Sequence, residues 1–216
     1  GLAKLGQPLN ILAGNPQLIV TSLLDSGRFH RIVRSRQHAS DKTAIWQSLR
    51  LAYPNILFEE YDSTTLYLQD KVQFTSRFPA TFSEFRRALD TVAFRPSSTR
   101  PASLPAPTSI KLDIPMVAVA GNSRHPRGGE TAGAQHLDKY FSTDAASSYK
   151  DTRNQFFGER YATGFSPWLA LGCVSPVQIF ELLRLYESQR GANESTGWIL
   201  FELMWREFFR WHAGYY

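Results

Sequence analysis

The most strongly patterned stretch of the chain, residues 198–211, reads WILFELMWREFFRW. It contains no Gly or Pro, so nothing interrupts a helix. Glu202, Trp205, Arg206 and Phe209 are spaced i, i+3, i+4 and i+7 and therefore share one helical face, while apolar residues cover most of the remaining circumference. A helix that is apolar nearly all round is buried, and a buried charge needs a partner or a ligand. Two interpretations stay open: an internal ion pair between Glu202 and Arg206, or a helix that lines a pocket for a flat, anionic ligand.

The first ninety residues alternate short apolar runs with helical periodicity. Three of the runs predict strands, at residues 9–13, 29–33 and 56–58. Asn15 and Pro16 open one intervening helix, with Asn as the cap and Pro at the first position, and Ser40 caps the next. The alternation predicts parallel strands joined by right-handed crossovers, which is an incomplete, Rossmann-like α/β unit.

The middle of the chain loses this pattern and then regains it. Residues 66–78 read as loop, whereas residues 81–92 place four apolar side chains on one helical face and leave Arg86 and Arg87 to solvent. Residues 94–128 are rich in Pro and basic residues, so they predict an extended linker. We therefore expect an α/β domain over 1–93, a linker over 94–128 and a second domain over 129–216.

Helical signals dominate the second domain. One helix follows Gly129, a second begins at Pro167 with Ser166 as its cap, and a third begins at Pro176. Ser175 caps the third helix, whose apolar face is formed by Ile179, Leu182, Leu183 and Tyr186. The predicted fold class is α/β plus all-α.

Composition narrows the class of protein. The 216 residues are 43% hydrophobic and 20% charged, as in a folded soluble protein, and the net charge of +5 is compatible with a polyanionic partner without requiring one. The single cysteine, Cys173, excludes an internal disulfide and a thiolate metal cluster, and we expect no metal site. No apolar run reaches membrane-spanning length, so we expect an intracellular, monomeric protein without a membrane partner, in the cytoplasm, the nucleus or an organelle.

Three spaced motifs carry a family resemblance. They are YKDTRN at 149–154, FSPWLALGCVSP at 165–176 and FELMWREFF at 201–209. Together they resemble the flavin-binding half of the photolyase/cryptochrome family, and FSPWLALGC is most similar to the cryptochrome DASH branch. The residues GGETA at 128–132 are similar to that branch too, and the resemblance runs in order along nearly the whole chain.

The resemblance implies a noncovalent FAD in an all-helical domain beside an α/β antenna domain. It further implies a photolyase, which splits cyclobutane pyrimidine dimers by blue-light-driven electron transfer from reduced flavin, with single-stranded DNA favoured in DASH members. The FAD contacts it implies are Tyr149, Ala162, Thr163, Gly164, Phe165, Ser166, Leu169, Arg206 and Phe209. Arg153, Glu202 and Trp205 are implied to contact DNA. Of these, Trp205 stacks on the flipped dimer and Glu202 binds its base edges, so both are implied catalytic residues. A folate antenna, methenyltetrahydrofolate, is also implied, with Asp41 as the one candidate contact.

The chain departs from the family pattern at three positions and at both ends. Ala162 removes a hydroxyl, Gly164 replaces a cation, and Val177 replaces an arginine, so the anion site is expected to be weakened. The family's opening strands and pocket-closing helices have no counterpart, so the chain resembles an internal fragment or a truncated product. Two alternatives to repair therefore stay open: a blue-light signalling cryptochrome without repair turnover, and an inactive module that does not hold FAD.

Overall fold

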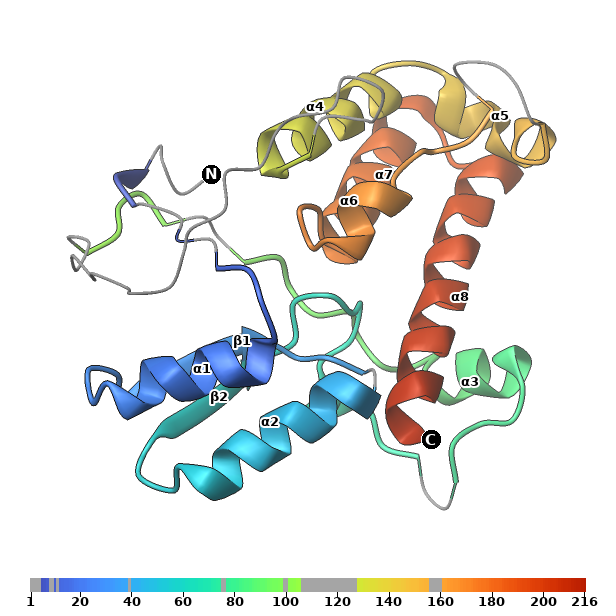
Figure 1. Cartoon of the computed structure of the whole chain (residues 1–216). Coiled ribbons are helices and arrows are strands. Elements are labelled where there is room, and N and C mark those ends of the chain that lie inside the picture. The colour runs from blue at the N-terminus through green and yellow to red at the C-terminus, as the bar shows by residue number, and fades with distance from the viewer. Residues whose placement is uncertain are drawn as a thin grey trace. The chain divides into compact units, whose positions relative to one another are not determined.

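The computed structural model describes residues 5–7, 10, 12–38, 40–74, 77–98, 101–105, 128–155 and 161–216 (Figure 1). Its first elements in chain order are α1 (Pro16–Asp25), β1 (Arg31–Ser35), α2 (Ser40–Ala52), β2 (Leu57–Tyr61), the 3-10 helix η2 (Gln69–Lys71) and α3 (Phe82–Ala88). The remaining helices are α4 (Glu130–Phe141), α5 (Ala145–Thr152), α6 (Ser166–Ala170), α7 (Pro176–Arg190) and α8 (Glu194–Tyr215). The fold is therefore α/β followed by all-α, as predicted.

The chain divides into two compact units. The first comprises Gly1–Arg34, Ala39–Tyr61 and Ser98–Arg127, and the second comprises Ser35–His38, Asp62–Ser97 and Gly128–Tyr216. Only parts of the predicted linker are described, namely 94–98, 101–105 and 128. The division into domains at 1–93, 94–128 and 129–216 stays a prediction.

The first unit contains a two-stranded parallel sheet and two helices. β1 and β2 are neighbours and are joined through α2, as the alternation predicts. The buried Trp46 of α2 meets Phe58 of β2 edge to face, with ring centroids 4.8 Å apart, and thereby packs the helix on the sheet. Asn15 caps α1, because its side-chain oxygen accepts hydrogen bonds from the amides of Gln17 at 2.9 Å and Leu18 at 3.3 Å.

The strand predicted at 9–13 is not among the elements of this unit. Of its described residues, Leu12 forms only an isolated bridge and Ala13 has no regular structure, while Leu9 and Ile11 lie outside the described residues. The other two predicted strands exist, but β1 and β2 each extend past the predicted end, to Ser35 and Tyr61. The extensions carry Arg34 and Glu60, whose guanidinium and carboxylate pair at 2.8 Å across the two strands.

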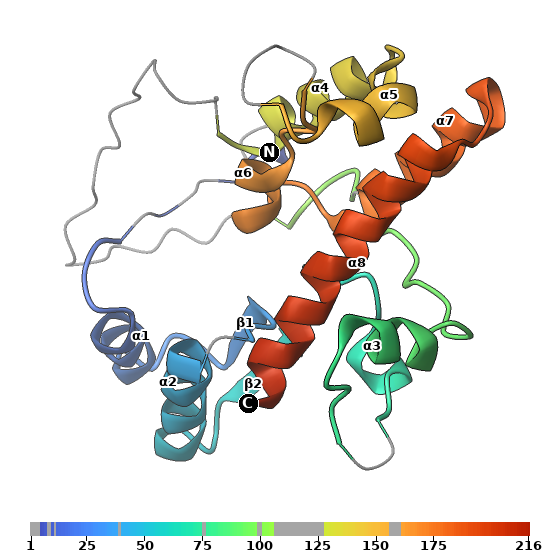
Figure 2. The same ribbon diagram turned by 90° about the vertical axis from the view of Figure 1, so that its right-hand side faces the viewer.

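The second unit is organised around α8, its longest helix. Figure 2 shows α3 beside the C-terminal half of α8, where Phe85 of α3 meets Phe208 of α8 with ring centroids 5.4 Å apart. α7 begins with the predicted cap, strengthened by a capping box in which Ser175 and Gln178 bind each other's backbone amides. The predicted apolar face of α7 is in the core, with Ile179 and Leu183 0% exposed.

Two local predictions need correction in this unit. Ser166 is the first residue of α6 and not its cap, because Phe165 already has helical dihedral angles and no side chain caps the helix. Residues 66–78 are not all loop, since η2 lies within them. Residues 66–78 are also not entirely exposed to solvent, because Leu66 is 0% exposed.

Candidate functional site

The least buried face of α8 carries the four residues that the sequence places together. Glu202, Trp205 and Arg206 are half-buried and Phe209 is 60% exposed. The opposite face, with Leu203, Met204, Glu207, Phe208 and Trp211, is buried. The prediction that these four residues share a face is confirmed. The expectation that their charges lie within a buried stripe is wrong, because the buried acid of α8 is Glu207.

The internal ion pair between Glu202 and Arg206, one of the two interpretations left open by the sequence, is not formed. Glu202 instead accepts a hydrogen bond from Arg153, the C-cap residue of α5, with 2.5 Å between Oε1 and Nη1. The same guanidinium lies 4.2 Å from the ring centroid of Trp198, a cation–π contact. The Lys150 amide also donates to the Ser195 hydroxyl at 3.1 Å, so α5 is fixed along α8 and brings Arg153 to Glu202.

Tyr149 joins this cluster from α5. Its side chain is buried, and this burial raises the pKa of its hydroxyl. The charge of Glu202 raises this pKa further, and the charge of Arg153 lowers it in part. The hydroxyl therefore stays protonated at neutral pH and can donate a hydrogen bond. The structure thus brings together Tyr149, Arg153 and Glu202 from the predicted set.

Glu207 is the most deeply buried charged residue among those that the structure describes, with 0% exposure. Its Oε1 accepts hydrogen bonds from the amides of Leu66 at 2.9 Å and Tyr67 at 3.2 Å, and from the Trp211 indole at 2.9 Å. Burial raises the pKa of Glu207, and these hydrogen bonds and the charge of Arg206 offset part of the rise. The sequence interpretation gave Glu207 no role, although its i, i+4 spacing from Leu203 and to Trp211 places it on the apolar side.

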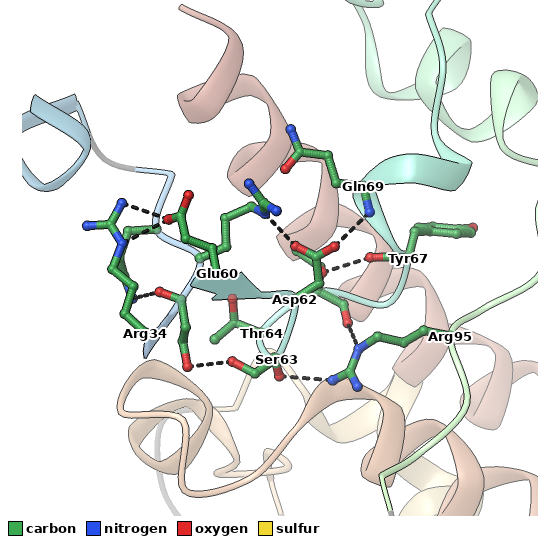
Figure 3. Close-up of polar contacts among 12 residues, drawn as sticks. Arg34, Glu60, Asp62, Ser63, Thr64, Tyr67, Gln69 and Arg95 are labelled. Atoms are coloured by element: carbon green, nitrogen blue, oxygen red, sulfur yellow. Dashed lines mark hydrogen bonds and ion pairs between the residues drawn. The ribbon is translucent and has the colours of Figure 1, made fainter. Parts of the chain in front are cut away.

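The residues 63–67, here called the 63–67 segment, are held by arginine side chains from α8 and from the chain after α3. Figure 3 shows the contacts of Arg95. Arg206 donates to the Thr64 carbonyl at 2.8 Å, and Arg210 donates to the Thr64 hydroxyl at 2.8 Å. Arg95 donates to the carbonyls of Thr65 at 2.7 Å and Ser63 at 2.9 Å. Arg95 is only 8% exposed, so a residue predicted to lie in a solvated linker is an internal clamp.

The guanidinium of Arg206 is only partly satisfied by these contacts. Its Nη2 is buried and has no hydrogen-bond partner among the described residues. Burial, together with the charge of Arg210, lowers the pKa of Arg206 to about 10, so the group is still a cation at neutral pH. A buried cationic donor without an acceptor is suited to an anionic or carbonyl-bearing ligand.

The loop before α6 is held by α4. His136 Nε2 lies 2.7 Å from the Thr163 carbonyl oxygen, and the His136 ring stacks on Trp168 with centroids 4.8 Å apart. Gly164 has a φ of +65°, and a Cβ added there would lie 3.0 Å from His136 Nε2. A side chain at this position would be strained and crowded, so this backbone conformation favours glycine. Val177 is 1% exposed, so a cation in its place would be buried at high cost.

The other predicted cofactor contacts are divided between the core and the surface. Phe165 and Leu169 are buried, Ala162 and Thr163 are half-buried, and Ser166 is exposed. Within the described part of the chain, no hydrogen bond, ion pair or ring contact joins residues 161–166 to Arg206 or Phe209. The structure therefore offers two groups of candidate contacts, one before α6 and one on α8.

Trp205 is the middle ring of an aromatic stack. Its indole lies 4.0 Å from the Phe82 ring at an interplanar angle of 10°, and 5.5 Å from the Phe209 ring at 29°. Beside the stack is a cleft of about 580 Å³, lined by Thr81, Phe82, Ser83, Arg86, Arg87, Asp90, Phe201 and Trp205. As predicted, Arg86 and Arg87 are exposed, and neither guanidinium has an ion pair or hydrogen bond with another described residue.

The donor set fits a flat, anionic cofactor. The hydroxyls of Tyr149, Thr163 and Ser166 make no hydrogen bond to any residue that the structure describes, and Arg206 Nη2 is equally free. Hydroxyls and a guanidinium are the groups that bind phosphates and ring carbonyls. In the described ranges there is no group of three or more residues arranged to hold a metal ion, and no helix that could span a membrane.

Comparisons with known proteins find full-length similarity for this chain. No family model matches it. Cryptochrome DASH of Vibrio parahaemolyticus is 36% identical over 217 residues, which cover 100% of this chain and 49% of the relative. The crystal structure of Synechocystis sp. PCC6803 cryptochrome superposes with a TM-score of 0.85 at 32% identity, over 100% of this chain and 48% of that one.

A more distant solved structure agrees in fold. The bacterial class III photolyase of Agrobacterium tumefaciens superposes with a TM-score of 0.75 at 18% identity, over 100% of this chain and 47% of that one. At this identity the likeness concerns the fold alone. The chain spans about half the length of the curated relatives it matches.

Proposed function

The chain belongs to the photolyase/cryptochrome family, and from this premise we propose that it carries part of the working site of a DASH-type, FAD-dependent DNA photolyase. The proposed reaction is the blue-light-driven splitting of cyclobutane pyrimidine dimers in single-stranded DNA. One observation supports it above the others: the open face of α8 bears an indole and a carboxylate, beside a cation whose buried Nη2 has no partner among the described residues.

The residues proposed to hold FAD are the two groups of candidate contacts. Tyr149, Thr163 and Ser166 offer free hydroxyls for the phosphates and ribityl chain, and Arg206 offers its Nη2 to the flavin. Ala162, Gly164, Phe165, Leu169 and Phe209 complete the proposed contact set. Bound, reduced FAD would supply the light-driven electron. The protein groups bind and orient the cofactor, and buried Phe165 and Leu169 keep water from that side.

The residues proposed to meet DNA are Arg153, Glu202 and Trp205. Arg153 offers a cation to a phosphate, and the Glu202 carboxylate offers an acceptor to the edge of a flipped base. The Phe82 and Phe209 rings flank Trp205, so the proposed stacking of a base on its indole requires the exposed Phe209 ring to move aside. A base that replaced it would gain stacking of roughly 1–3 kcal/mol.

The second ligand in the proposal is a folate antenna. Asp41, in the first turn of α2, is exposed and remains the proposed contact for methenyltetrahydrofolate. The cellular compartment likewise stays a prediction.

The test begins with the natural-length protein purified in the dark. We expect a flavin absorption spectrum, and blue light should then remove cyclobutane dimers from UV-irradiated oligothymidylate, faster in single strands than in duplexes. The same sample kept in the dark is the control, and Arg28→Ala, at an exposed position of the first unit, is the matched variant.

The outcomes separate the alternatives. Bound flavin without light-dependent dimer loss would favour a signalling cryptochrome over a repair enzyme. A colourless preparation that takes up no added FAD would overturn the proposal and favour an inactive module.

A further inference from the structure

We infer that Glu207 is a positioning residue: by fixing the 63–67 segment it sets the orientation of the Arg206 guanidinium, whose Nη2 is left free for an acceptor atom of the bound ligand. The identity of that ligand as a flavin rests on the proposed function. The orientation itself rests on contacts within the second unit alone.

The carboxylate of Glu207 binds backbone rather than its cationic neighbours. Its Oε1 accepts from the amides of Leu66 and Tyr67 and from the Trp211 indole, and its Oε2 has no partner among the described residues. Both amides belong to the 63–67 segment and lie outside any helix or strand. Glu207 is 0% exposed and accepts three hydrogen bonds, two of them from the 63–67 segment, so it fixes the position of this segment against α8.

The segment in turn holds Arg206. The Thr64 carbonyl, two residues before Leu66, accepts from Arg206 Nη1 at 2.8 Å. Arg210 holds the hydroxyl of the same threonine at 2.8 Å, one helical turn further along α8. Glu207 and Arg206 are adjacent on α8. Glu207 therefore fixes the 63–67 segment, and the Thr64 carbonyl of that segment holds Arg206.

This arrangement orients the Arg206 guanidinium in advance and leaves its Nη2 without a described hydrogen-bond partner. Arg206 forms no ion pair with a described acid, since Glu202 pairs with Arg153 and the Glu207 carboxylate binds amides. A long, flexible side chain normally loses rotamer freedom when it binds a ligand. Because the Thr64 carbonyl has already fixed Arg206, that loss occurs on folding and not on binding.

The experiment compares three variants of the natural-length protein. Glu207→Leu removes every acceptor, whereas Glu207→Gln keeps one side-chain oxygen and places its amide where Oε2 has no described partner. Leu183→Ala, 0% exposed on α7, is the matched control for lost stability. The readouts are the FAD dissociation constant from fluorescence quenching, the fine structure of the bound flavin's visible band, and the midpoint of thermal unfolding.

We expect Glu207→Leu to weaken FAD binding at least about tenfold relative to Leu183→Ala at similar thermal stability, and to shift the visible band. Glu207→Gln should bind within about threefold of the wild type, because its Oε1 can still accept the same hydrogen bonds. Equal FAD affinity in Glu207→Leu and Leu183→Ala would overturn the inference while leaving the proposed function intact.

Two further measurements cover the remaining outcomes. If Glu207→Leu does not fold, Glu207→Asp withdraws the carboxylate by one methylene from the amides of Leu66 and Tyr67; weaker FAD binding supports the inference, and unchanged binding overturns it. If the wild type binds no FAD, the proposed function fails. The positioning is then read from the Arg206 Nε–Hε resonance in ¹⁵N relaxation, which should be rigid in the wild type and mobile in the variant. Equal mobility would overturn it.

Discussion

Arg153 and Glu202, the two charged residues proposed to meet DNA, are hydrogen-bonded to each other, with 2.5 Å between Nη1 and Oε1. Their side chains are 28% and 39% exposed, so the pair is reached by solvent and screened by salt. In this arrangement each residue makes the other less available to bind DNA. A phosphate must draw Arg153 away from Glu202, and a base edge must draw Glu202 away from Arg153.

We therefore expect Glu202→Gln to tighten binding of undamaged single-stranded DNA while lowering light-driven dimer splitting. Freeing Arg153 should add about one phosphate contact, which would steepen the slope of log affinity against log salt by about 0.7. Fluorescence anisotropy of labelled oligothymidylate across a salt series measures both quantities. Glu59→Gln, which frees Arg31 in the first unit, is the matched control and should leave the slope unchanged. An unchanged slope in Glu202→Gln would contradict the prediction.

Trp205→Ala should lower the free energy of unfolding by about 1–3 kcal/mol, because it removes, among its ring contacts, two stacked ones that each contribute about 0.5–1.5 kcal/mol. Those contacts are with Phe82 and Phe209. Trp205→Phe keeps a ring in the stack and should lose less. Urea unfolding followed by circular dichroism measures the difference, and a loss below about 0.5 kcal/mol in Trp205→Ala would show that the stack contributes little.

The double variant Arg86→Ala, Arg87→Ala should weaken single-stranded DNA binding and flatten its salt dependence. Both guanidinium groups are exposed beside the cleft that Trp205 lines and have no described partner, so they are free to bind phosphates. The slope should fall by about 0.7 for each phosphate that the variant no longer neutralises. Arg28→Ala, another exposed arginine, should leave it unchanged. Equal slopes in all three proteins would show that this cleft lies off the path of the DNA.

Glu207 should make stability depend on pH. Burial raises its pKa above the usual value of 4.5, so the folded state favours the protonated form. Its contribution to stability is fully present below about pH 4.5 and is lost as the pH rises through the raised pKa. The unfolding free energy of the wild type should thus fall relative to that of Glu207→Gln as the pH rises through this window. Parallel pH profiles of the two proteins would contradict the raised pKa.

Gly164→Ala should destabilise the protein by about 1–2 kcal/mol, because its φ of +65° disfavours any residue with a Cβ and His136 occupies the adjacent space. Gly197→Ala is a control of opposite sign. Gly197 is in α8 with open space around it, so alanine there should stabilise by about 0.5–1 kcal/mol. Thermal unfolding of the two variants distinguishes these effects, and a neutral Gly164→Ala would argue against the left-handed conformation.

The sequence predicted the elements whose signals are local. Ser175 and Pro176 marked the start of α7, and Asn15 and Pro16 marked the start of α1, because caps act within a few residues of themselves. Periodicity likewise placed Phe82 and Phe85 on the buried face of α3. It also grouped Glu202, Trp205, Arg206 and Phe209 on the face of α8 that turns out to be least buried.

The site's polar connections could not be predicted in this way, because they join residues far apart in the chain. Spacing on one helix left a Glu202–Arg206 pair open, but α5 brings Arg153 to Glu202, and the Thr64 carbonyl binds Arg206. Arg95 looked like a linker residue because Pro and Ser follow it, although its guanidinium binds the carbonyls of Ser63 and Thr65 and the hydroxyl of Ser175. Only tertiary structure reveals such partners.

The amides of Leu66 and Tyr67 point to one more property of this fold. They lie in no helix or strand, where backbone hydrogens ordinarily exchange with deuterium within seconds to minutes, yet they donate to a carboxylate with 0% exposure. Exchange at these two amides requires α8 to separate from the 63–67 segment. An irregular stretch of backbone should therefore be among the slowest to take up deuterium, at a rate set by the opening of the helical unit.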